Sequence, residues 1–225
     1  MPTIHRHLDD ELHVLADLLM EMAYLVDEQL ANAVDALSKL DLEQAERVRM
    51  RDDEIDALEI KIDRQCERIL ALHQPVASEL RVIITAIKIN TDLERIGDHA
   101  KNLARAARVV AESPDVLNAV RLTDMADAAR AMLRKVQDAF ARRDRVAARE
   151  VVADDQTVDR LYQDVLAGLV AYGQEHPEQL RAVSRLITSA KSIERISDHA
   201  KNIAEQVVFV VEGTDIRHRK LTERP

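Results

Sequence analysis

Several residue types are scarce in this chain of 225 residues, which has no tryptophan, two phenylalanines, four glycines and one cysteine. So few glycines leave no Gly-rich loop to hold a nucleotide phosphate. The lone Cys66 cannot form an internal disulfide, and its helical spacing from Ile62 and Ile69 predicts a buried, unreactive thiol. Ala, Leu, Glu, Arg and Asp dominate instead, a composition typical of an all-α protein.

Other absences exclude several classes of function for this chain. No apolar run approaches the roughly 18 residues of a membrane span, and the polar start has no signal-peptide core. The net charge of −9, with no basic stripe outweighing the acids, argues against a nucleic-acid binder. The chain has neither a nucleophile motif nor the Glu-x-x-His pair of di-iron oxidase bundles. We therefore expect a cytoplasmic protein that is not an enzyme.

The prolines divide the chain into long periodic segments, because they occur only outside these segments or at their edges. Asp41 and Asp144 are placed to cap two helices, and Gly213 to end the last one. Apolar residues recur at spacings of three and four between these breaks. This pattern predicts six helices, at 5–38, 42–72, 76–111, 115–141, 144–172 and 177–211.

The connections between these helices are short, so consecutive helices should run antiparallel. The halves also correspond in order, since Leu80-Arg81 matches Leu180-Arg181 and Pro75 matches Pro177. We therefore predict two tandem three-helix bundles related by an internal repeat, residues 1–112 and 113–213. The polar residues 214–225 should form a flexible tail.

The most informative feature is an eleven-residue segment that occurs twice, 100 residues apart. Residues 94–104 read ERIGDHAKNLA and residues 194–204 read ERISDHAKNIA, so nine of eleven positions are identical. Packing alone requires only similar hydrophobicity, yet here polar residues match. Each copy places two acids four residues apart on one helix face, which is unfavourable unless a cation neutralises them.

The helix before each copy carries a second pair of acids at the same spacing. On a helical wheel the acids of the repeated segment fall on a polar stripe, away from the core residues Leu93, Ile96, Ala100, Leu103 and Ala107. Each half should therefore present four carboxylates on an exposed face. The predicted metal-binding residues are Asp52, Asp56, Glu94 and Asp98 in the first half, and Asp155, Asp159, Glu194 and Asp198 in the second.

Four carboxylates at short range suit Mg²⁺, Mn²⁺, Ca²⁺ or iron, with Zn²⁺ as a further candidate. The alternative is that these acids pair with Arg95, Arg195, Lys101 and Lys201 on a solvated surface. His99 and His199 follow the second acid in each copy, about 100° round the helix. We expect them to pack or to form an interhelical hydrogen bond rather than to share the first ligand shell.

Together these residues resemble the PhoU family of phosphate-signalling regulators, over about residues 5–212. The likeness extends to His7–Leu12 (HLDDEL), to residues 74–81 (QPVASELR), to both copies of the repeated segment and to residues 210–213 (VVEG). Glu79 stands where Asp is common in the family, and the tail after Gly213 is particular to this chain.

The resemblance implies two three-helix bundles whose acidic motifs hold multinuclear iron or other metal ions, with zinc, manganese or magnesium as alternatives. It implies a non-enzymatic cytoplasmic homodimer that reaches the membrane only through its partners and binds no nucleic acid. Those partners are the ATPase subunit of a phosphate ABC transporter and a sensor histidine kinase, and the protein acts as a negative regulator. The family's metal motifs carry over to Glu94, Asp98, Glu194 and Asp198, and by extension to the acids of the preceding helices.

Three other interpretations stay open. The chain could be a helical adaptor whose acids only solubilise it, and metal analysis of the purified protein separates this from a metal-binding regulator. It could be a carboxylate-bridged metalloenzyme, against which the missing Glu-x-x-His argues. It could also be an accessory regulator of a low-affinity phosphate transporter.

Overall fold

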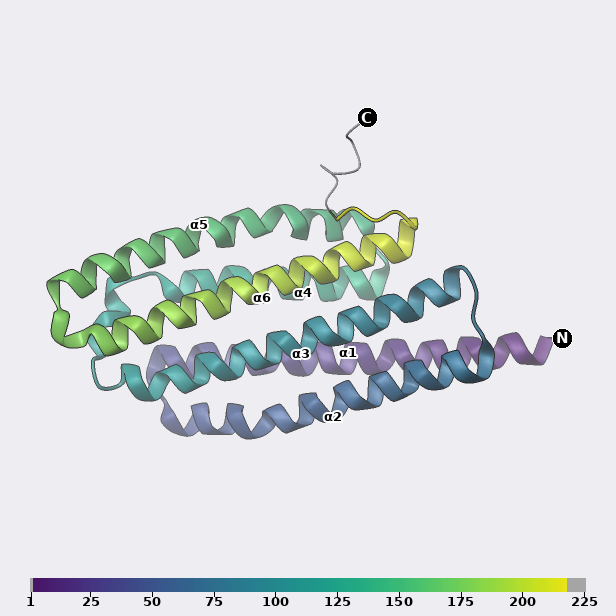
Figure 1. Cartoon of the computed structure of the whole chain (residues 1–225), viewed down its shortest axis with the longest axis horizontal. Helices are drawn as coiled ribbons and strands as arrows, with labels where there is room; N and C mark the ends of the chain where they lie inside the picture. The colour runs from purple at the N-terminus through teal and green to yellow at the C-terminus, as the bar shows by residue number, and fades with distance from the viewer. Residues whose placement is uncertain (1, 218–225) are drawn as a thin grey trace, which may run out of the picture.

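The computed structural model describes the backbone of residues 2–217 and the side chains of residues 7–217. Over these residues the chain is helical and contains no β-strand, which confirms the all-α prediction (Figure 1). None of the described helices is long and apolar enough to cross a membrane. In chain order the elements are α1 (Pro2–Lys39), α2 (Leu42–His73), α3 (Ser78–Val110), η1 (Pro114–Ala119), α4 (Leu122–Arg142), α5 (Arg145–Glu175), η2 (Pro177–Gln179) and α6 (Leu180–Glu212).

Capping residues set several helix ends as predicted. The Asp41 side chain accepts a 2.9 Å hydrogen bond from the backbone N–H of Gln44 at the start of α2. Asp144 accepts two hydrogen bonds from backbone amides in the first turn of α5, at 2.9 and 3.1 Å. Gly213 ends α6 with φ +73°, a conformation that glycine adopts without the strain of a Cβ atom.

The fourth helix begins later than predicted, at Leu122 rather than at residue 115. Residues 114–119 form the 3₁₀ helix η1, and Val120 is extended, with φ −141° and ψ 154°. Val116 and Val120 are four residues apart, so the apolar spacing imitates a helix through this connection. The chain passes here from one bundle to the other, and fully buried Val116 anchors the crossing in the core. A short 3₁₀ helix, η2, likewise delays the start of α6.

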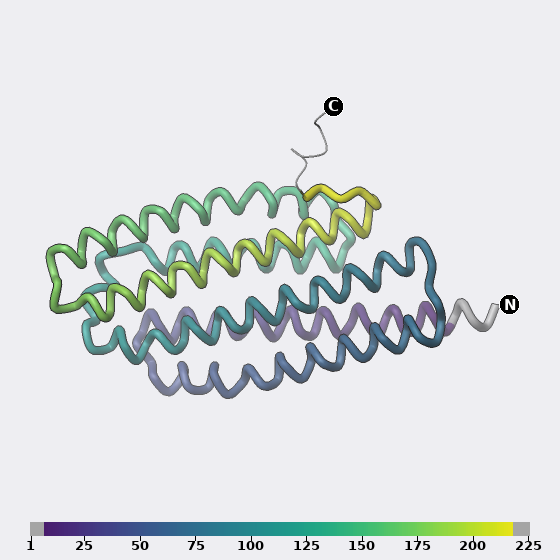
Figure 2. The backbone as a smooth tube through the Cα atoms, viewed as in Figure 1, coloured from purple at the N-terminus to yellow at the C-terminus, as the bar shows by residue number. Residues whose placement is uncertain are grey.

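The six helices form two three-helix bundles that lie side by side, α1–α3 in one and α4–α6 in the other (Figure 1). Consecutive helices run antiparallel, as the tube in Figure 2 shows. The bundles meet mainly along α3 and α6, and α1 also contacts α4. The two helices that carry the repeated segment therefore form the centre of the molecule.

The buried core follows the predicted stripe. Cys66 is also buried, as predicted, and burial raises the pKa of its thiol to about 12, so the thiol stays protonated at neutral pH. Small side chains along α3 and α6 let neighbouring helices pack against several sides of each of these two helices. The five predicted stripe residues, Leu93, Ile96, Ala100, Leu103 and Ala107, are each at most 2% exposed.

The C-terminal segment continues past α6. Residues 214–217 are described, and Ile216 packs against the core. Residues 218–225, the larger part of the predicted tail, lie outside the described residues.

A charged contact joins the two bundles. Asp27 of α1 is only 9% exposed. Its carboxylate accepts hydrogen bonds from Arg130 Nε and Nη2 at 2.8 and 3.1 Å, and from Arg134 Nε at 3.2 Å. Close by, Gln137 Nε2 donates a 2.8 Å hydrogen bond to the backbone oxygen of Ala23. These contacts fix the register of α4 against α1.

Replacing Asp27 by alanine should lower the free energy of unfolding by about 2 kcal/mol, because two guanidinium groups lose a shared, largely buried partner. Urea unfolding followed by circular dichroism measures this loss. Glu46→Ala is the matched control, since it removes an exposed ion pair with Arg49 and should cost at most about 0.5 kcal/mol. Equal losses in the two variants would contradict a role for Asp27 in joining the bundles.

Candidate functional site

Each copy of the repeated segment places its two acids beside the acid pair of the preceding helix. The negative charges of Asp52 and Asp98 both act on Asp56, and those of Asp155 and Glu194 both act on Asp159. The eight predicted residues therefore form two groups of four. The first cluster is Asp52 and Asp56 of α2 with Glu94, Asp98 and Lys101 of α3. The second cluster is Asp155 and Asp159 of α5 with Glu194, Asp198 and Lys201 of α6.

The clusters lie between helices rather than on an open face. Asp52 and Asp155 are buried, and the carboxylates of Glu94 and Glu194 are mostly covered. The prediction of an exposed ladder is therefore wrong for these four side chains. The antiparallel packing of α2 on α3, and of α5 on α6, covers much of the polar stripe that a helical wheel places away from the core. Asp98 and Asp198 remain partly exposed.

Lys101 supplies positive charge to the first cluster. Its ammonium group donates a hydrogen bond to Asp52 Oδ2 and lies 3.0 Å from Asp98 Oδ1. The other carboxylate oxygen of Asp52 accepts a 3.0 Å hydrogen bond from Gln29 Nε2 of α1. Both oxygens of this buried carboxylate therefore have partners, as a buried charge requires.

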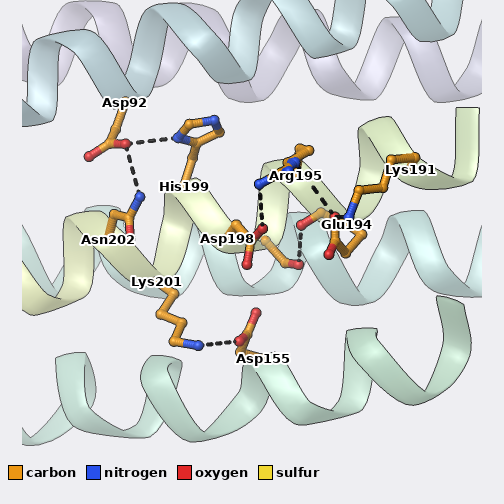
Figure 3. A network of polar contacts seen from close by, with 10 residues as sticks. Asp92, Asp155, Lys191, Glu194, Arg195, Asp198, His199, Lys201 and Asn202 are labelled. Carbon is orange, nitrogen blue, oxygen red and sulfur yellow. Dashed lines mark hydrogen bonds and ion pairs between the residues drawn. The ribbon is translucent and has the colours of Figure 1, made fainter. Parts of the chain in front are cut away.

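The second cluster repeats the lysine contact but leaves one oxygen without a partner (Figure 3). Lys201 Nζ donates a 2.6 Å hydrogen bond to Asp155 Oδ2. Asp155 Oδ1 is buried and has no hydrogen-bond partner among the described residues. Asp198 pairs with Arg195, whose Nη1 lies 3.4 Å from Asp198 Oδ2. The two clusters therefore differ, although the segments that build them are nearly identical.

The proton affinities of the acids reflect this difference. Burial, and then the charge of the acid one turn earlier, raises the pKa values of Asp56 and Asp159 above the usual range. Burial and a neighbouring glutamate also raise the pKa of Asp198. At Asp98 burial acts in the same direction, but the hydrogen bond and charge of Lys101, together with Glu94 and Arg95, lower the pKa below its usual value. Lys101 thus stabilises the charged form of its acid more fully than Arg195 and Lys201 do for Asp198.

The oxygen-rich donor set suits a hard cation. Between residues 7 and 217, however, no three His, Cys, Asp or Glu side chains converge closely enough to hold a metal ion. Lys101 and Lys201 occupy positions among the carboxylate oxygens, so a metal ion would have to displace their ammonium groups. Asp155 Oδ1 is buried without a hydrogen-bond partner among the described residues, and the neighbouring acids would have to move closer together to hold a cation beside it.

The two histidines of the repeated segments meet where α3 packs on α6. Their ring centroids are 5.7 Å apart. His199 Nδ1 lies 2.8 Å from Asp92 Oδ1 of α3, and Asn202 Nδ2 donates to the same oxygen at 3.3 Å (Figure 3). This confirms an interhelical hydrogen bond for His199. His99 packs in the interface, and its Nδ1 has no hydrogen-bond partner among the described residues.

Sequence reasoning missed several polar residues around the first cluster. Gln29 is one of them. It occurs three residues after buried Val26 in an otherwise apolar stripe of α1, and a polar residue in such a stripe is a signal for a buried polar contact. Glu59 and Asp63 are two more, and they continue the acidic face of α2. Asn90 Nδ2 donates a 2.9 Å hydrogen bond to Asp63 Oδ1, and burial followed by the charge of Asp63 raises the pKa of Glu59.

Fold and site together define an all-α protein of two tandem three-helix repeats, each with an acidic cluster that contains a lysine. The PhoU domain model matches residues 19–107 and 122–207, so each match lies within one bundle. The chain belongs to the PhoU family.

Similar proteins support the assignment over nearly the full length. A phosphate-specific transport system accessory protein PhoU homolog of Pseudomonas aeruginosa is 42% identical over 220 residues, covering 97% of this chain and 91% of that protein. The phosphate-specific transport system accessory protein PhoU of Escherichia coli is 35% identical over 208 residues, covering 92% of this chain and 86% of its own.

Solved structures agree with the fold. The crystal structure of PhoU from Pseudomonas aeruginosa superposes with a TM-score of 0.86 at 41% identity, covering 92% of this chain and 99% of that chain. The phosphate transport system regulatory protein PhoU from Streptococcus pneumoniae gives a TM-score of 0.84 at 27% identity, with 93% and 99% covered.

Proposed function

We propose that this chain regulates phosphate uptake and represses the phosphate-starvation response when phosphate is plentiful. The observation that carries the proposal is family membership through both repeats, because the curated relatives are named as accessory proteins of a phosphate-specific transport system. In this role the chain works in the cytoplasm as a homodimer, without catalysis. It couples the ATPase subunit of a phosphate ABC transporter to a sensor histidine kinase.

The two acidic clusters give this regulator a way to change its surface. Asp98 and Asp198 are partly exposed, so a cation bound beside them alters the charge that a partner meets. Iron is the first candidate, with zinc, manganese and magnesium as alternatives, because carboxylate oxygens are the donors. A bound cation then changes the local charge of the chain, and this changes the relative affinity of the chain for the transporter and for the kinase.

A second candidate function is a helical adaptor that needs no metal. The observation that favours it is the lysine already present in each cluster, since Lys101 and Lys201 neutralise part of the acidic charge. Metal analysis and thermal unfolding separate the candidates. Bound transition metal, and a higher melting temperature with Fe²⁺, Mn²⁺ or Zn²⁺, support the metal-binding regulator. Metal at background level with no thermal shift supports the adaptor.

The regulatory role is tested in cells that lack the gene and carry a phosphate-starvation reporter. We expect the reporter to be active without the chain and to be repressed in phosphate-rich medium when the wild-type chain is restored. A reporter that stays repressed without the chain would contradict the role. If transport at high external phosphate changes instead, the chain serves a low-affinity transporter.

A further inference from the structure

A cavity lies between α1 and α2, apart from the residues that form the two acidic clusters. Its volume is about 300 Å³, at the lower end of the range for small-molecule sites. Among the described residues that line it, five of six are polar and none is acidic. They are Gln29 and Asn32 of α1, with Gln44, Arg47, Val48 and Arg51 of α2. The cavity therefore offers hydrogen bonds and positive charge, which suit a polar anion.

The second bundle shows how the equivalent place can be filled by the chain itself. The two bundles correspond here at an offset of 103 residues, because Asp41 and Asp144 cap the second helix of each bundle directly after its first helix ends. At this offset the residues that replace Asn32, Arg47 and Arg51 are Lys135, Glu150 and Asp154. Lys135 Nζ lies 2.8 Å from Glu150 Oε2 and 3.0 Å from Asp154 Oδ2, so this bundle neutralises its charges across the two helices.

The first bundle has the opposite charges on its second helix, Arg47 and Arg51, and an uncharged amide on its first. Arg47 pairs with Glu43 of its own helix at 3.0 Å, but both side chains are at least 60% exposed, so water and salt screen the pair. Arg51 uses two of its five N–H donors on Glu28, at 2.7 and 2.9 Å, and its Nε lies 3.6 Å from exposed Glu54. An anion in the cavity would supply the counter-charge that the second bundle supplies from its own helices.

A buried amide adds a hydrogen-bond acceptor to the wall of the cavity. Gln29 is 1% exposed, and its Nε2 donates to Asp52 Oδ1 at 3.0 Å and to the backbone oxygen of Gly97 at 3.4 Å. The flipped amide would set its oxygen against both of these acceptors, so the contacts fix the orientation of Oε1. Oε1 has no hydrogen-bond partner among the described residues. A buried acceptor without a donor is costly, so a ligand that donates to Oε1 gains affinity.

We infer that this cavity binds a small organic oxyanion that also carries a hydroxyl group. The phosphate or carboxylate of the ligand pairs with Arg47 and Arg51, and its hydroxyl donates to Gln29 Oε1. The ligand replaces the hydrogen bond from Gln44 Nε2 to Asn32 Oδ1, which is long at 3.3 Å, and both amides then contact the ligand. The inference goes beyond the proposed function and does not depend on it, since it involves neither a metal ion nor a partner protein.

The test is calorimetry of the full-length chain with two matched pairs of probes at about pH 8, where a phosphate ester is fully ionised. Glycerol 3-phosphate and malate carry an anionic group and a hydroxyl, whereas methyl phosphate and succinate carry the anionic group alone. We expect a hydroxylated probe to bind at one site per chain, at least about fivefold more tightly than its counterpart without the hydroxyl. Gln29→Met removes the acceptor and should abolish this preference. Arg47→Met and Arg51→Met should each weaken binding at least about tenfold.

Arg49→Met is the matched control, because it removes the same charge from α2 at an exposed pair with Glu46 and should change the affinity less than about twofold. Circular dichroism melting checks that each variant folds. If Gln29→Met does not fold, Asn32→Asp takes its place, and the negative charge that it brings into the cavity should weaken binding at least about tenfold. The hydroxylated probe that binds more tightly shows whether the anionic group is a phosphate or a carboxylate. Absence of binding by both hydroxylated probes at about 10 mM, equal affinities within each pair, or equal losses in Arg49→Met and Arg47→Met would overturn the inference.

Discussion

Replacing Lys101 by methionine should lower the free energy of unfolding by about 3 kcal/mol in metal-free buffer. The substitution keeps the apolar stem and removes the ammonium group from buried Asp52 and from Asp98. Breaking a buried ion pair by removing one partner leaves an uncompensated charge, which costs about 3–5 kcal/mol. Part of this cost is relieved because Asp52 keeps its hydrogen bond from Gln29.

Urea unfolding at pH 7 measures this loss, with Lys39→Met, which breaks an exposed pair with Asp35, as the control. The double variant Lys101→Met/Asp52→Asn should recover part of the stability, because it also removes the negative charge of Asp52 that Lys101→Met leaves uncompensated. A loss in Lys101→Met no larger than in the control would show that the first cluster does not depend on its lysine. Absence of recovery in the double variant would show that Asp52 is not the group left uncompensated.

The second large effect is a dependence of stability on pH through His99. Burial, and then the charge of His199, holds the pKa of His99 at about 4, below its usual 6.5. In the unfolded chain His99 therefore binds a proton near pH 6.5, whereas in the folded chain it binds one only near pH 4. Stability should fall as the pH falls through this window, by about 3 kcal/mol in full, at 1.36 kcal/mol per pKa unit.

The measurement compares the free energy of unfolding of the wild type and His99→Gln from pH 7 to pH 4. Carboxylates titrate in both proteins, so the difference between the two curves isolates His99. The wild type should lose about 3 kcal/mol more than the variant. His7→Gln alters an exposed histidine and should leave the wild-type curve unchanged. Parallel curves for the wild type and His99→Gln would contradict a buried, neutral His99.

Most of the fold could be predicted from local chemistry. The spacing of apolar residues gave six helices, and Asp41, Asp144 and Gly213 marked their ends because capping depends on neighbouring residues only. The error at residues 115–121 has a longer-range cause. Val116 and Val120 keep a helical spacing, but the chain must turn there from one bundle to the other. The local spacing of apolar residues carries no information about such a turn.

The grouping of the eight acids was predictable from the sequence, but their environment was not. Duplication and the four-residue spacing identified all eight acids that the structure gathers into two clusters. A helical wheel treats each helix alone, so it could not show that neighbouring helices cover Asp52 and Asp155. Gln29 of α1 reaches the first cluster, and Asp92 of α3 reaches His199 of α6, only through the packing of helices.

The most direct test of the proposed mechanism is the binding of purified transporter ATPase subunit to this chain, measured with Mn²⁺ and after chelation. The wild-type chain should change affinity at least about tenfold between these conditions, because cation occupancy alters the charge beside Asp98 and Asp198. The double variant Asp98→Ala/Asp198→Ala should bind the subunit equally in both. Equal binding by the wild-type chain with and without the cation would contradict the mechanism.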